Sequence, residues 1–230
     1  MELIVGNIAF STWSLRPWLV LKRCGAEFTV REIPLYGPES APALAEHSPS
    51  GKVPVLKVDG VTIWDSMAIS VFATERFPDA KLWPTDAHAR WLARSVACEM
   101  HSGFGAMRNE CAMGPDAAGV IHTMVGPDRA PTPTSETVAS DVRRFVAIVT
   151  EMRARFGADG PYLFGEWSMP DAFFTPLATR IRHYQIDLAD HGDVDGVAAT
   201  YVAELLQQPD FLEWVQLAVT VRPQVSIRAD

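Results

Sequence analysis

The stretch KVPVLKVDGVTIWDSMAI, residues 52–69, contains two short runs with strand character, joined at Asp59 and Gly60. An Asp-Gly pair between two such runs is a strong signal for a β-hairpin. The first run contains Pro54 near its start. Proline has no N–H to donate to a neighbouring strand, so it is normally confined to edges, strand starts and bulges. We therefore expect Pro54 at the beginning of the strand.

A helix is expected directly after this hairpin. Asp65 and Ser66 stand where it should begin, and residues 66–76 continue with helical character. The unpaired N–H groups and the dipole of a helix N-terminus favour a carboxylate ligand. Ser66 or Asp65 can equally cap the helix by accepting a hydrogen bond from one of these N–H groups. Capping and ligand binding use the same geometry, and the sequence leaves both open.

The segments before the hairpin complete a β-containing first third of the chain. Residues 2–8 and 28–33 are expected to be strands, and the helical run between them, RPWLVLKRCG, stops at Gly25. Strand, helix, strand is a βαβ unit, so these two strands should be parallel. Residues 37–51 are rich in Gly, Pro, Ser and Ala and are expected to form a loop with at most one short helix.

The rest of the chain is helical in character. It follows a turn-rich linker, residues 77–86, and shows helical spacing in segments 87–112, 135–157, 170–184, 197–206 and 209–218. No convincing strand appears among them, and the Gly- and Pro-rich segment 114–135 is expected either to cover a cleft or to hang outside it. The change in character predicts two domains, residues 1–80 and residues 87–230.

Composition places the chain among ordinary globular proteins. Hydrophobic residues make up 48% of the 230 positions and charged residues 21%. No run approaches the roughly 18 apolar residues of a membrane span, and the start of the chain lacks the basic leader of a secretory signal. The net charge of −8 argues against nucleic acid as a partner, because affinity for its phosphate backbone comes from clustered Lys and Arg.

The cysteines and histidines predict neither a disulfide framework nor a metal site. Cys24, Cys98 and Cys111 are scattered, and no CxxC occurs. Free thiols are typical of a reducing cytoplasm, which is the location we expect. The six histidines are spread without the spacing of metal ligands.

Four short motifs, taken together and in this order, resemble those of the cytosolic glutathione transferases, and the resemblance covers nearly the whole chain. They are STWSLR (11–16), SPSGKVP (48–54), DSMAI (65–69) and SMPDA (168–172). The resemblance implies a thioredoxin-like N-terminal domain with a mixed four-stranded sheet, followed by an all-helical C-terminal domain. The last motif resembles the N-capping box of the family's central buried helix, which is a folding element.

The same resemblance implies a binding site for glutathione as co-substrate. In that family the Val-Pro bond is cis, and Pro54 is the matching residue. The main-chain N–H and C=O of Val53 would face outward and pair with the peptide backbone of glutathione. Ser66 would receive the γ-glutamyl carboxylate, Asp65 stands where the family most often has Glu or Gln, and Lys52 would pair with the glycyl carboxylate.

Catalysis by this family requires the glutathione thiol as thiolate, because the thiolate is the nucleophile. Family members stabilise it with Tyr, Ser or Cys just after the first strand, and here the segment offers neither Tyr nor Cys. Ser11 matches the catalytic serine of the theta- and zeta-like classes. We favour Ser11 as the residue that contacts sulfur, with Thr12 as an auxiliary donor and Ser14 as helix cap; Ser14 is the alternative catalytic residue.

The second substrate of the family binds between the two domains. This implicates the segment MHSGFGAMR, residues 100–108, and within it His101, Phe104 and Arg108. Arg108 facing the cleft would favour an anionic or carbonyl-bearing substrate. Trp13 either walls this pocket or packs in the interior. The zeta class has a cysteine in its place, a departure that argues against the isomerase and dehalogenation activities of that class.

The sequence thus predicts a glutathione S-transferase that conjugates glutathione to small hydrophobic electrophiles, a detoxification reaction. Two alternatives stay open: a glutathione-dependent isomerase or lyase, and a non-catalytic binding or scaffold protein of the same fold. The family usually forms homodimers, and the apolar candidates for such a surface are Trp64, Phe72 and Trp91.

Overall fold

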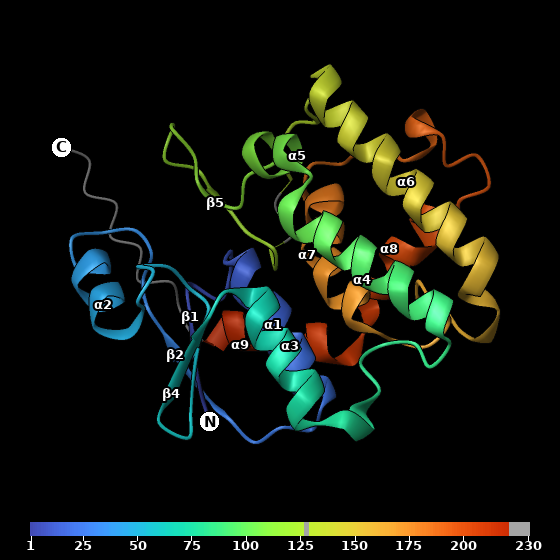
Figure 1. Cartoon of the computed structure of the whole chain (residues 1–230). Coiled ribbons are helices and arrows are strands. Elements are labelled where there is room, and N and C mark those ends of the chain that lie inside the picture. Colours follow the sequence, from blue (N-terminus) through green and yellow to red (C-terminus); the bar gives the residue numbers. More distant parts are fainter. Residues whose placement is uncertain (127–128, 221–230) are drawn as a thin grey trace.

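The structure is a computed structural model of the chain and describes residues 1–126 and 129–220. In Figure 1 a sheet with its helices lies beside a bundle of longer helices. The sheet part contains β1 (Glu2–Val5), α1 (Thr12–Arg23), β2 (Thr29–Glu32), α2 (Ser40–His47), β3 (Val55–Val58), β4 (Val61–Trp64) and α3 (Ser66–Arg76). The bundle part contains α4 (Ala87–Ser102), α5 (Gly105–Glu110), α6 (Glu136–Phe156), α7 (Met169–His183), α8 (Val197–Gln207) and α9 (Pro209–Thr220).

The sheet has the strand order β2-β1-β3-β4 and mixed directions. β1 and β2 are parallel, as the βαβ unit predicted, and β3 runs antiparallel to both β1 and β4. The β3–β4 hairpin closes with Val58 opposite Val61. Pro54 lies immediately before β3, so its missing N–H removes no bond from the ladder. This is the thioredoxin-like arrangement that the sequence predicted.

Alternating side chains of the sheet bury two separate apolar faces. Leu3 and Val5 belong to the large core that includes α1, α3 and the bundle. Ile4, one residue between them, packs with Ile33 and Val55 in a small cluster on the side of α2. Successive strand residues point to opposite faces, which explains the division. α1 also packs along α7, so the sheet part and the bundle share one core.

The predicted helix over 87–112 is interrupted, and this part of the prediction was wrong. α4 ends at Ser102 and α5 begins at Gly105. Phe104 has a left-handed backbone with φ 55°, which no helix interior tolerates. A Cβ at Gly103 would lie 2.7 Å from the carbonyl oxygen of Glu99, so only glycine fits this turn.

The segment 114–135 is not without strands, which corrects a second expectation. It contains a two-stranded hairpin of β5 (Gly114–Pro115) and β6 (Ile121–His122), too short to produce an alternating pattern in sequence. After the hairpin, Met124 N–H donates to the carbonyl oxygen of Ala9 at 2.8 Å, so the segment is tied to the loop before α1. Residues 127–128 of this segment, and 221–230 of the expected second domain, lie outside the described residues.

The described residues contain neither a candidate membrane span nor a candidate metal site. No helix there is both long enough and apolar enough to cross a membrane. Within the same ranges, 1–126 and 129–220, no three His, Cys, Asp or Glu side chains gather in a way that would hold a metal ion.

Candidate functional site

A cavity of about 570 Å³ lies where the opening sequence stretch folds back on α1. Its lining consists of Trp13, Ser50, Lys52, Val53, Pro54, Trp64, Asp65 and Ser66. Five of these were predicted from sequence as glutathione-binding residues. The structure therefore brings together two motifs that are separated by the whole β3–β4 hairpin.

The loop before β3 presents Val53 to this cavity. The Val53–Pro54 bond is cis, as expected. Ser48 closes the loop: its hydroxyl donates to the carbonyl oxygen of Lys52 at 2.6 Å and accepts from the Lys52 N–H at 3.1 Å. Among the described residues, neither main-chain group of Val53 has a hydrogen-bond partner. The Val53 main chain is therefore available to a ligand.

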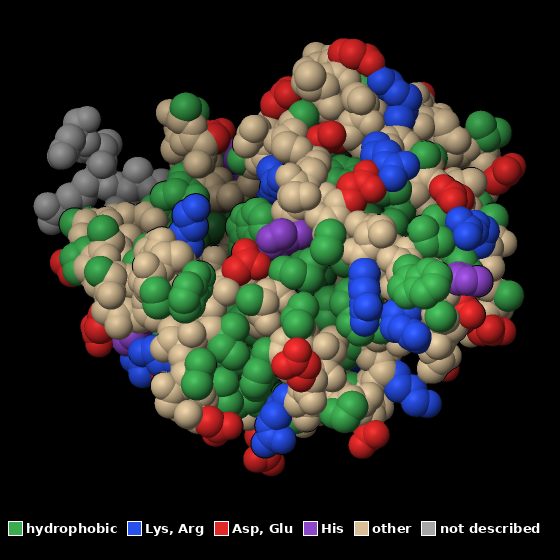
Figure 2. All heavy atoms as spheres, in the orientation of Figure 1, with side chains coloured by type: hydrophobic (Ala, Val, Ile, Leu, Met, Phe, Trp, Pro, Cys, Tyr) green, Lys and Arg blue, Asp and Glu red, His purple; other side chains and the backbone are tan. Residues whose placement is uncertain are grey.

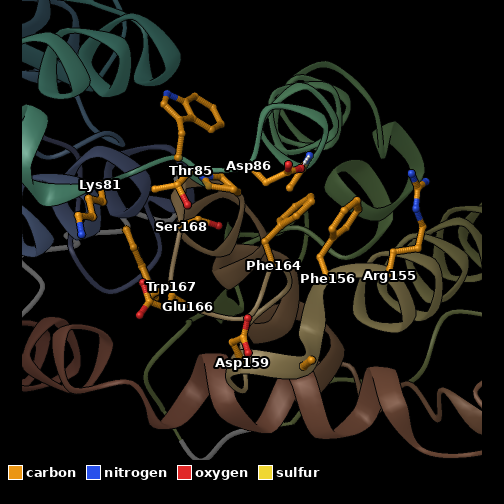
Figure 3. A pocket seen from close by; sticks show the side chains of 14 residues that line it. Lys81, Thr85, Asp86, Arg155, Phe156, Asp159, Phe164, Glu166, Trp167 and Ser168 are labelled. Atoms are coloured by element: carbon orange, nitrogen blue, oxygen red, sulfur yellow. Dashed lines mark hydrogen bonds between the residues drawn. The ribbon is translucent and has the colours of Figure 1, made fainter.

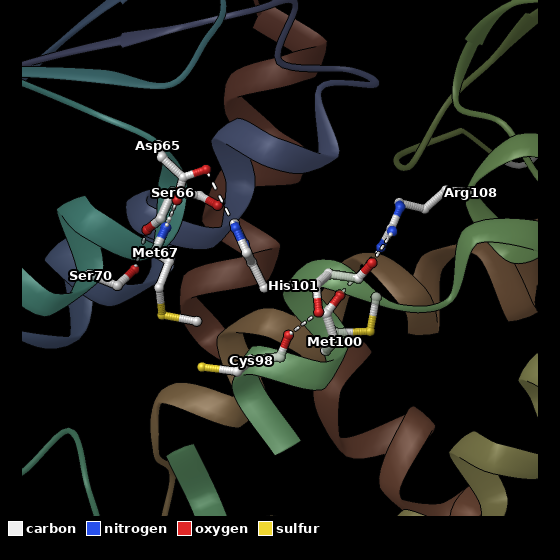
Figure 4. Close-up of polar contacts among 9 residues, drawn as sticks. Asp65, Ser66, Met67, Ser70, Cys98, Met100, His101 and Arg108 are labelled. Atoms are coloured by element: carbon white, nitrogen blue, oxygen red, sulfur yellow. Dashed lines mark hydrogen bonds and ion pairs between the residues drawn. The ribbon is translucent and has the colours of Figure 1, made fainter. Parts of the chain in front are cut away.

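The start of α3 settles which residue caps the helix. Asp65 is the N-cap, and its Oδ1 accepts from the Met67 N–H at 2.7 Å (Figure 4). Ser66 is only 1% exposed, yet its hydroxyl has no hydrogen-bond partner in the described part of the chain. Buried polar groups without partners are rare in folded proteins. With the capping role taken by Asp65, the Ser66 hydroxyl is left for a ligand that reaches the helix N-terminus.

Asp65 also links the two parts of the molecule. Its Oδ2 lies 3.4 Å from Nε2 of His101 on α4, as Figure 4 shows. The His101 ring meets the Trp13 ring edge-on, with centroids 5.5 Å apart. Burial lowers the pKa of His101, the positive charges of Arg16 and Arg108 lower it further, and Asp65 opposes them. The net direction is downward, which favours the neutral form of the His101 ring beside Trp13.

Two arginines, Arg16 and Arg108, lie against the Trp13 ring. The guanidinium carbon of Arg16 lies 4.3 Å from the Trp13 ring centroid, and that of Arg108 lies 5.6 Å from it. Arg16 is buried, and its Nε and Nη1 have no partners among the described residues. Burial, then the charges of Arg180 and Arg108, lowers the pKa of Arg16 to about 9. Asp65 partly offsets the charge of Arg16, and Asp141 that of Arg108. The unpartnered nitrogens of Arg16 still favour an anion beside Trp13.

Phe104 does not belong to this group, contrary to the sequence prediction. Its side chain is buried, and its ring faces Phe174 with centroids 6.1 Å apart. The break between α4 and α5 turns Phe104 into the bundle core, where it fills space between helices. Of the three residues predicted for the second-substrate pocket on this segment, His101 and Arg108 contact Trp13, whereas Phe104 packs in the core.

The expectation that Ser14 caps α1 was wrong. Ser11 is the N-cap residue of α1, although its side chain makes no capping hydrogen bond, and Ser14 lies within the first turn. The two hydroxyl oxygens are 2.8 Å apart and buried. Neither serine lines the cavity, whereas Trp13 between them does. Thr12 accepts a hydrogen bond from Nη2 of Arg180 at 3.3 Å.

The loop before Ser11 is held by residues that the sequence analysis missed. The main-chain oxygen of Asn7 accepts from the Ser11 N–H at 2.8 Å, and the Asn7 side chain bonds Leu35 N–H. Glu32 accepts from the Ile8 N–H at 3.2 Å. The available signal was two polar residues at the ends of two neighbouring parallel strands, which the topology places side by side.

A second cavity, of about 540 Å³, lies between the linker and the bundle (Figure 3). No residue predicted for the site lines it. Its polar groups already have partners: Asp86 accepts from Ala89 N–H at 2.8 Å, and the Trp167 indole N–H donates to Gln208 at 2.8 Å. None of the buried unpartnered polar atoms in the described residues belongs to its lining. The cavity at Pro54 is therefore the better candidate site.

Known proteins are similar to this chain in sequence. Residues 10–76 match the sequence model of the family described as "Glutathione S-transferase, N-terminal domain". A probable maleylacetoacetate isomerase of Caenorhabditis elegans is 34% identical over 98 residues, which span 43% of this chain and 45% of that protein. The maleylacetoacetate isomerase of Rattus norvegicus is 24% identical over 210 residues, 86% of this chain and 89% of that protein.

Solved structures share the fold. A glutathione transferase homologue from Burkholderia, crystallised with bound glutathione, superimposes with a TM-score of 0.69 at 22% identity, covering 95% of this chain and 98% of that one. A maleyl pyruvate isomerase, described as a bacterial glutathione S-transferase of the zeta class, gives a TM-score of 0.70 at 19% identity and the same coverage.

Proposed function

The chain belongs to the glutathione transferase family, and from this premise we propose that it is a cytoplasmic glutathione-dependent isomerase of small unsaturated carboxylates. One observation carries the proposal. The buried Ser66 hydroxyl and the Val53 main chain, both without partners among the described residues, line one cavity with Trp13, and Arg16 and Arg108 lie against the Trp13 ring.

Glutathione fits the polar side of the cavity. The γ-glutamyl carboxylate would accept from the Ser66 hydroxyl and the first N–H groups of α3. The cysteinyl main chain would pair with Val53 as an added strand. The exposed Lys52 ammonium would meet the glycyl carboxylate. This pose directs the thiol toward the start of α1, where Ser11 is the N-cap.

Ser11 would donate a hydrogen bond to the sulfur and stabilise the thiolate. A hydroxyl donor lowers the pKa of the thiol because it favours the charged form. The N-terminus of α1 adds a favourable dipole. The thiol proton leaves to solvent, and Ser11 keeps its own proton.

The isomerase reaction uses this thiolate twice. Sulfur forms a bond to one carbon of a carbon–carbon double bond conjugated to a carbonyl group, and the electron pair moves to the carbonyl oxygen as an enolate. Rotation about the former double bond follows; then the pair returns, the C–S bond breaks and glutathione is regenerated. Arg16, Arg108 and His101 around Trp13 would hold the negative charge of the carboxylate and the enolate. The names of the relatives support this choice.

Conjugation is the second candidate, and Trp13 is the observation that favours it. Its indole offers a broad apolar wall to the cavity where the zeta class has a cysteine. An apolar electrophile without a carboxylate would stack on this wall. The glutathione sulfur would form a bond to its carbon, the leaving group would depart, and the C–S bond would remain in the product.

Product analysis separates these reactions. Purified protein is incubated with glutathione and maleylacetoacetate, and in parallel with glutathione and an aromatic halide. Isomerisation predicts conversion of the first compound with the glutathione concentration unchanged and no conversion without glutathione. Conjugation predicts loss of one glutathione for each halide released. If neither reaction is observed and millimolar glutathione does not raise the melting temperature, both candidates are overturned and a scaffold protein is left.

A homodimer is part of the proposal. Figure 2 shows hydrophobic side chains on the face where β4, α3 and α4 lie, and the exposed large ones on these elements are Val61, Trp64, Val71 and Trp91. Phe72, the third aromatic residue named from sequence, is instead half-buried against the core. Sedimentation of the wild type and of Trp91→Glu should give a dimer and a monomer, respectively.

A further inference from the structure

A line of three hydrogen-bonding groups ends at Ser11. The main-chain N–H of Gly6, just after β1, donates to Ser14 Oγ at 3.0 Å. Ser14 Oγ in turn lies 2.8 Å from Ser11 Oγ. Ser14 is completely buried, and Ser11 is 5% exposed. Both hydrogen bonds are therefore shielded from water. A hydrogen bond is electrostatically stronger in the protein interior than in water.

The chemistry of these groups determines the direction of the line. An amide N–H can only donate, so Ser14 Oγ is an acceptor toward Gly6. If Ser11 also donated to Ser14, the Ser14 proton would be buried without an acceptor in the described part of the chain. If Ser14 donates to Ser11, every proton but one is used, and the remaining proton is that of Ser11. Each arrangement leaves one hydroxyl proton unused, but the second leaves it on Ser11, which is 5% exposed, whereas Ser14 is completely buried, so the second costs less.

We propose that Ser14 is a positioning residue that makes Ser11 a stronger donor to the glutathione sulfur. The line then runs from Gly6 N–H to Ser14, from Ser14 O–H to Ser11, and from Ser11 O–H to the thiolate. Hydrogen bonds in such a chain polarise one another, so each donor strengthens the next. The inference rests on the proposed function, because it assumes that Ser11 meets the sulfur.

Local structure holds this geometry before any ligand binds. Ser11 and Ser14 are three residues apart at the start of α1, so both side chains lie on one face of the first turn. Leu35 packs against Gly6 on the other side: a Cβ at position 6 would lie 2.4 Å from Leu35 Cδ1, so the close packing here requires glycine or a shift of Leu35. The Ser11 side chain makes no capping bond to the helix, so its hydroxyl is free to point elsewhere.

The test is the pKa of the bound glutathione thiol, measured by titrating the thiolate absorbance of the enzyme–glutathione complex. Ser14→Ala should raise this pKa by about one unit and lower kcat about fivefold, with the Kd of glutathione unchanged. In a Ser11→Ala background the same substitution should have no further effect on the pKa. Ser70→Ala is the matched control, since Ser70 is a buried helix serine that donates only to the Ser66 carbonyl oxygen among the described residues.

Ser14→Cys distinguishes donation from space filling and serves if Ser14→Ala does not fold. Cysteine nearly preserves the volume but donates weakly, so the thiol pKa should still rise. Suppose that Ser11→Ala raises the pKa of the glutathione thiol. If Ser14→Cys, or a folded Ser14→Ala, then leaves this pKa at its wild-type value, the inference is overturned. If Ser11→Ala itself left the pKa unchanged, the role of Ser11 in the proposed function would fail, and this inference with it.

Discussion

The helices α7 and α3 each begin at an almost completely buried serine, and they use it in opposite ways. At the start of α7, Ser168 N–H and Oγ–H both donate to Asp171, at 2.7 and 3.1 Å. At the start of α3, Ser66 is buried to the same degree, but its hydroxyl has no partner among the described residues. At α7 the polar groups of the serine are satisfied within the protein, and they stabilise the fold. At α3 the serine hydroxyl lacks a hydrogen-bond partner, and we assign that role to the ligand.

The largest difference between the two helix starts should appear at Asp171. Its carboxylate also accepts from Leu163 N–H and from the Tyr201 hydroxyl, at 3.1 and 2.8 Å. Asp171→Ala leaves these donors buried and unpaired, so the free energy of unfolding should fall by about 4 kcal/mol. Urea denaturation measures it. Asp86→Ala, which removes the exposed cap of α4, is the control and should cost about 1 kcal/mol. If the two substitutions lowered the free energy of unfolding equally, the start of α7 would be no more important for stability than an exposed helix cap.

Ser11→Ala should have the largest effect on activity. Loss of one donor to a developing or bound anion reduces kcat about a hundredfold. The Kd of glutathione should stay nearly the same, because Val53, Ser66 and Lys52 hold the rest of the tripeptide. Steady-state kinetics and calorimetric titration give the two quantities. An unchanged kcat would remove Ser11 from the mechanism and leave Ser14 as the alternative.

The pH dependence of stability should also originate at α7. Burial raises the pKa of Asp171 from 3.8 to about 6, against the hydrogen bonds donated to it. The folded protein therefore binds this proton more tightly than the unfolded chain does. The contribution of this protonated carboxyl group to the free energy of unfolding is fully present below about pH 4 and is lost as the pH rises to about 6.

Comparison with Asp171→Asn isolates this contribution. Relative to that variant, the free energy of unfolding of the wild type should decrease by about 2 kcal/mol from about pH 4 to about pH 6. Parallel stability curves for the two proteins would contradict the assignment.

The smallest expected effects, on glutathione binding and on stability, distinguish Ser66 from Ser168 most clearly. Ser66→Ala should weaken glutathione binding about tenfold, the loss of one hydrogen bond to a carboxylate. It should not lower stability without glutathione, because the hydroxyl has no partner in the described residues. Ser168→Ala should lower the free energy of unfolding by about 1 kcal/mol and leave the Kd unchanged. If both substitutions had the same pair of effects, the contrast between the helix starts would not hold.

Much of this contrast could be predicted from short motifs. Pro54 before a hairpin, Asp65-Ser66 after it and the Ser168–Asp171 box are local signals, since each lies within a few residues of the turn or helix start that it determines. The strand directions followed from the order of elements. The family resemblance supplied the roles of these residues.

The errors have a common physical origin in contacts between distant segments. Phe104 looked like a cleft residue until the Gly103 turn placed it against Phe174. The approach of Arg180 to Thr12 joins positions 168 residues apart, and no local pattern encodes it. The error at the start of α1 is different because it is local: the N-cap is Ser11 and not Ser14, a shift of three residues at a helix boundary, which is the least certain part of a helix assignment.

A crystal structure of the protein with glutathione tests the central claim most directly. The account predicts the γ-glutamyl carboxylate against the Ser66 hydroxyl, the cysteinyl main chain paired with Val53, and the sulfur within hydrogen-bond distance of Ser11 Oγ. Glutathione bound in the cavity near Trp167, or bound beside Pro54 with its sulfur directed away from Ser11, would contradict it.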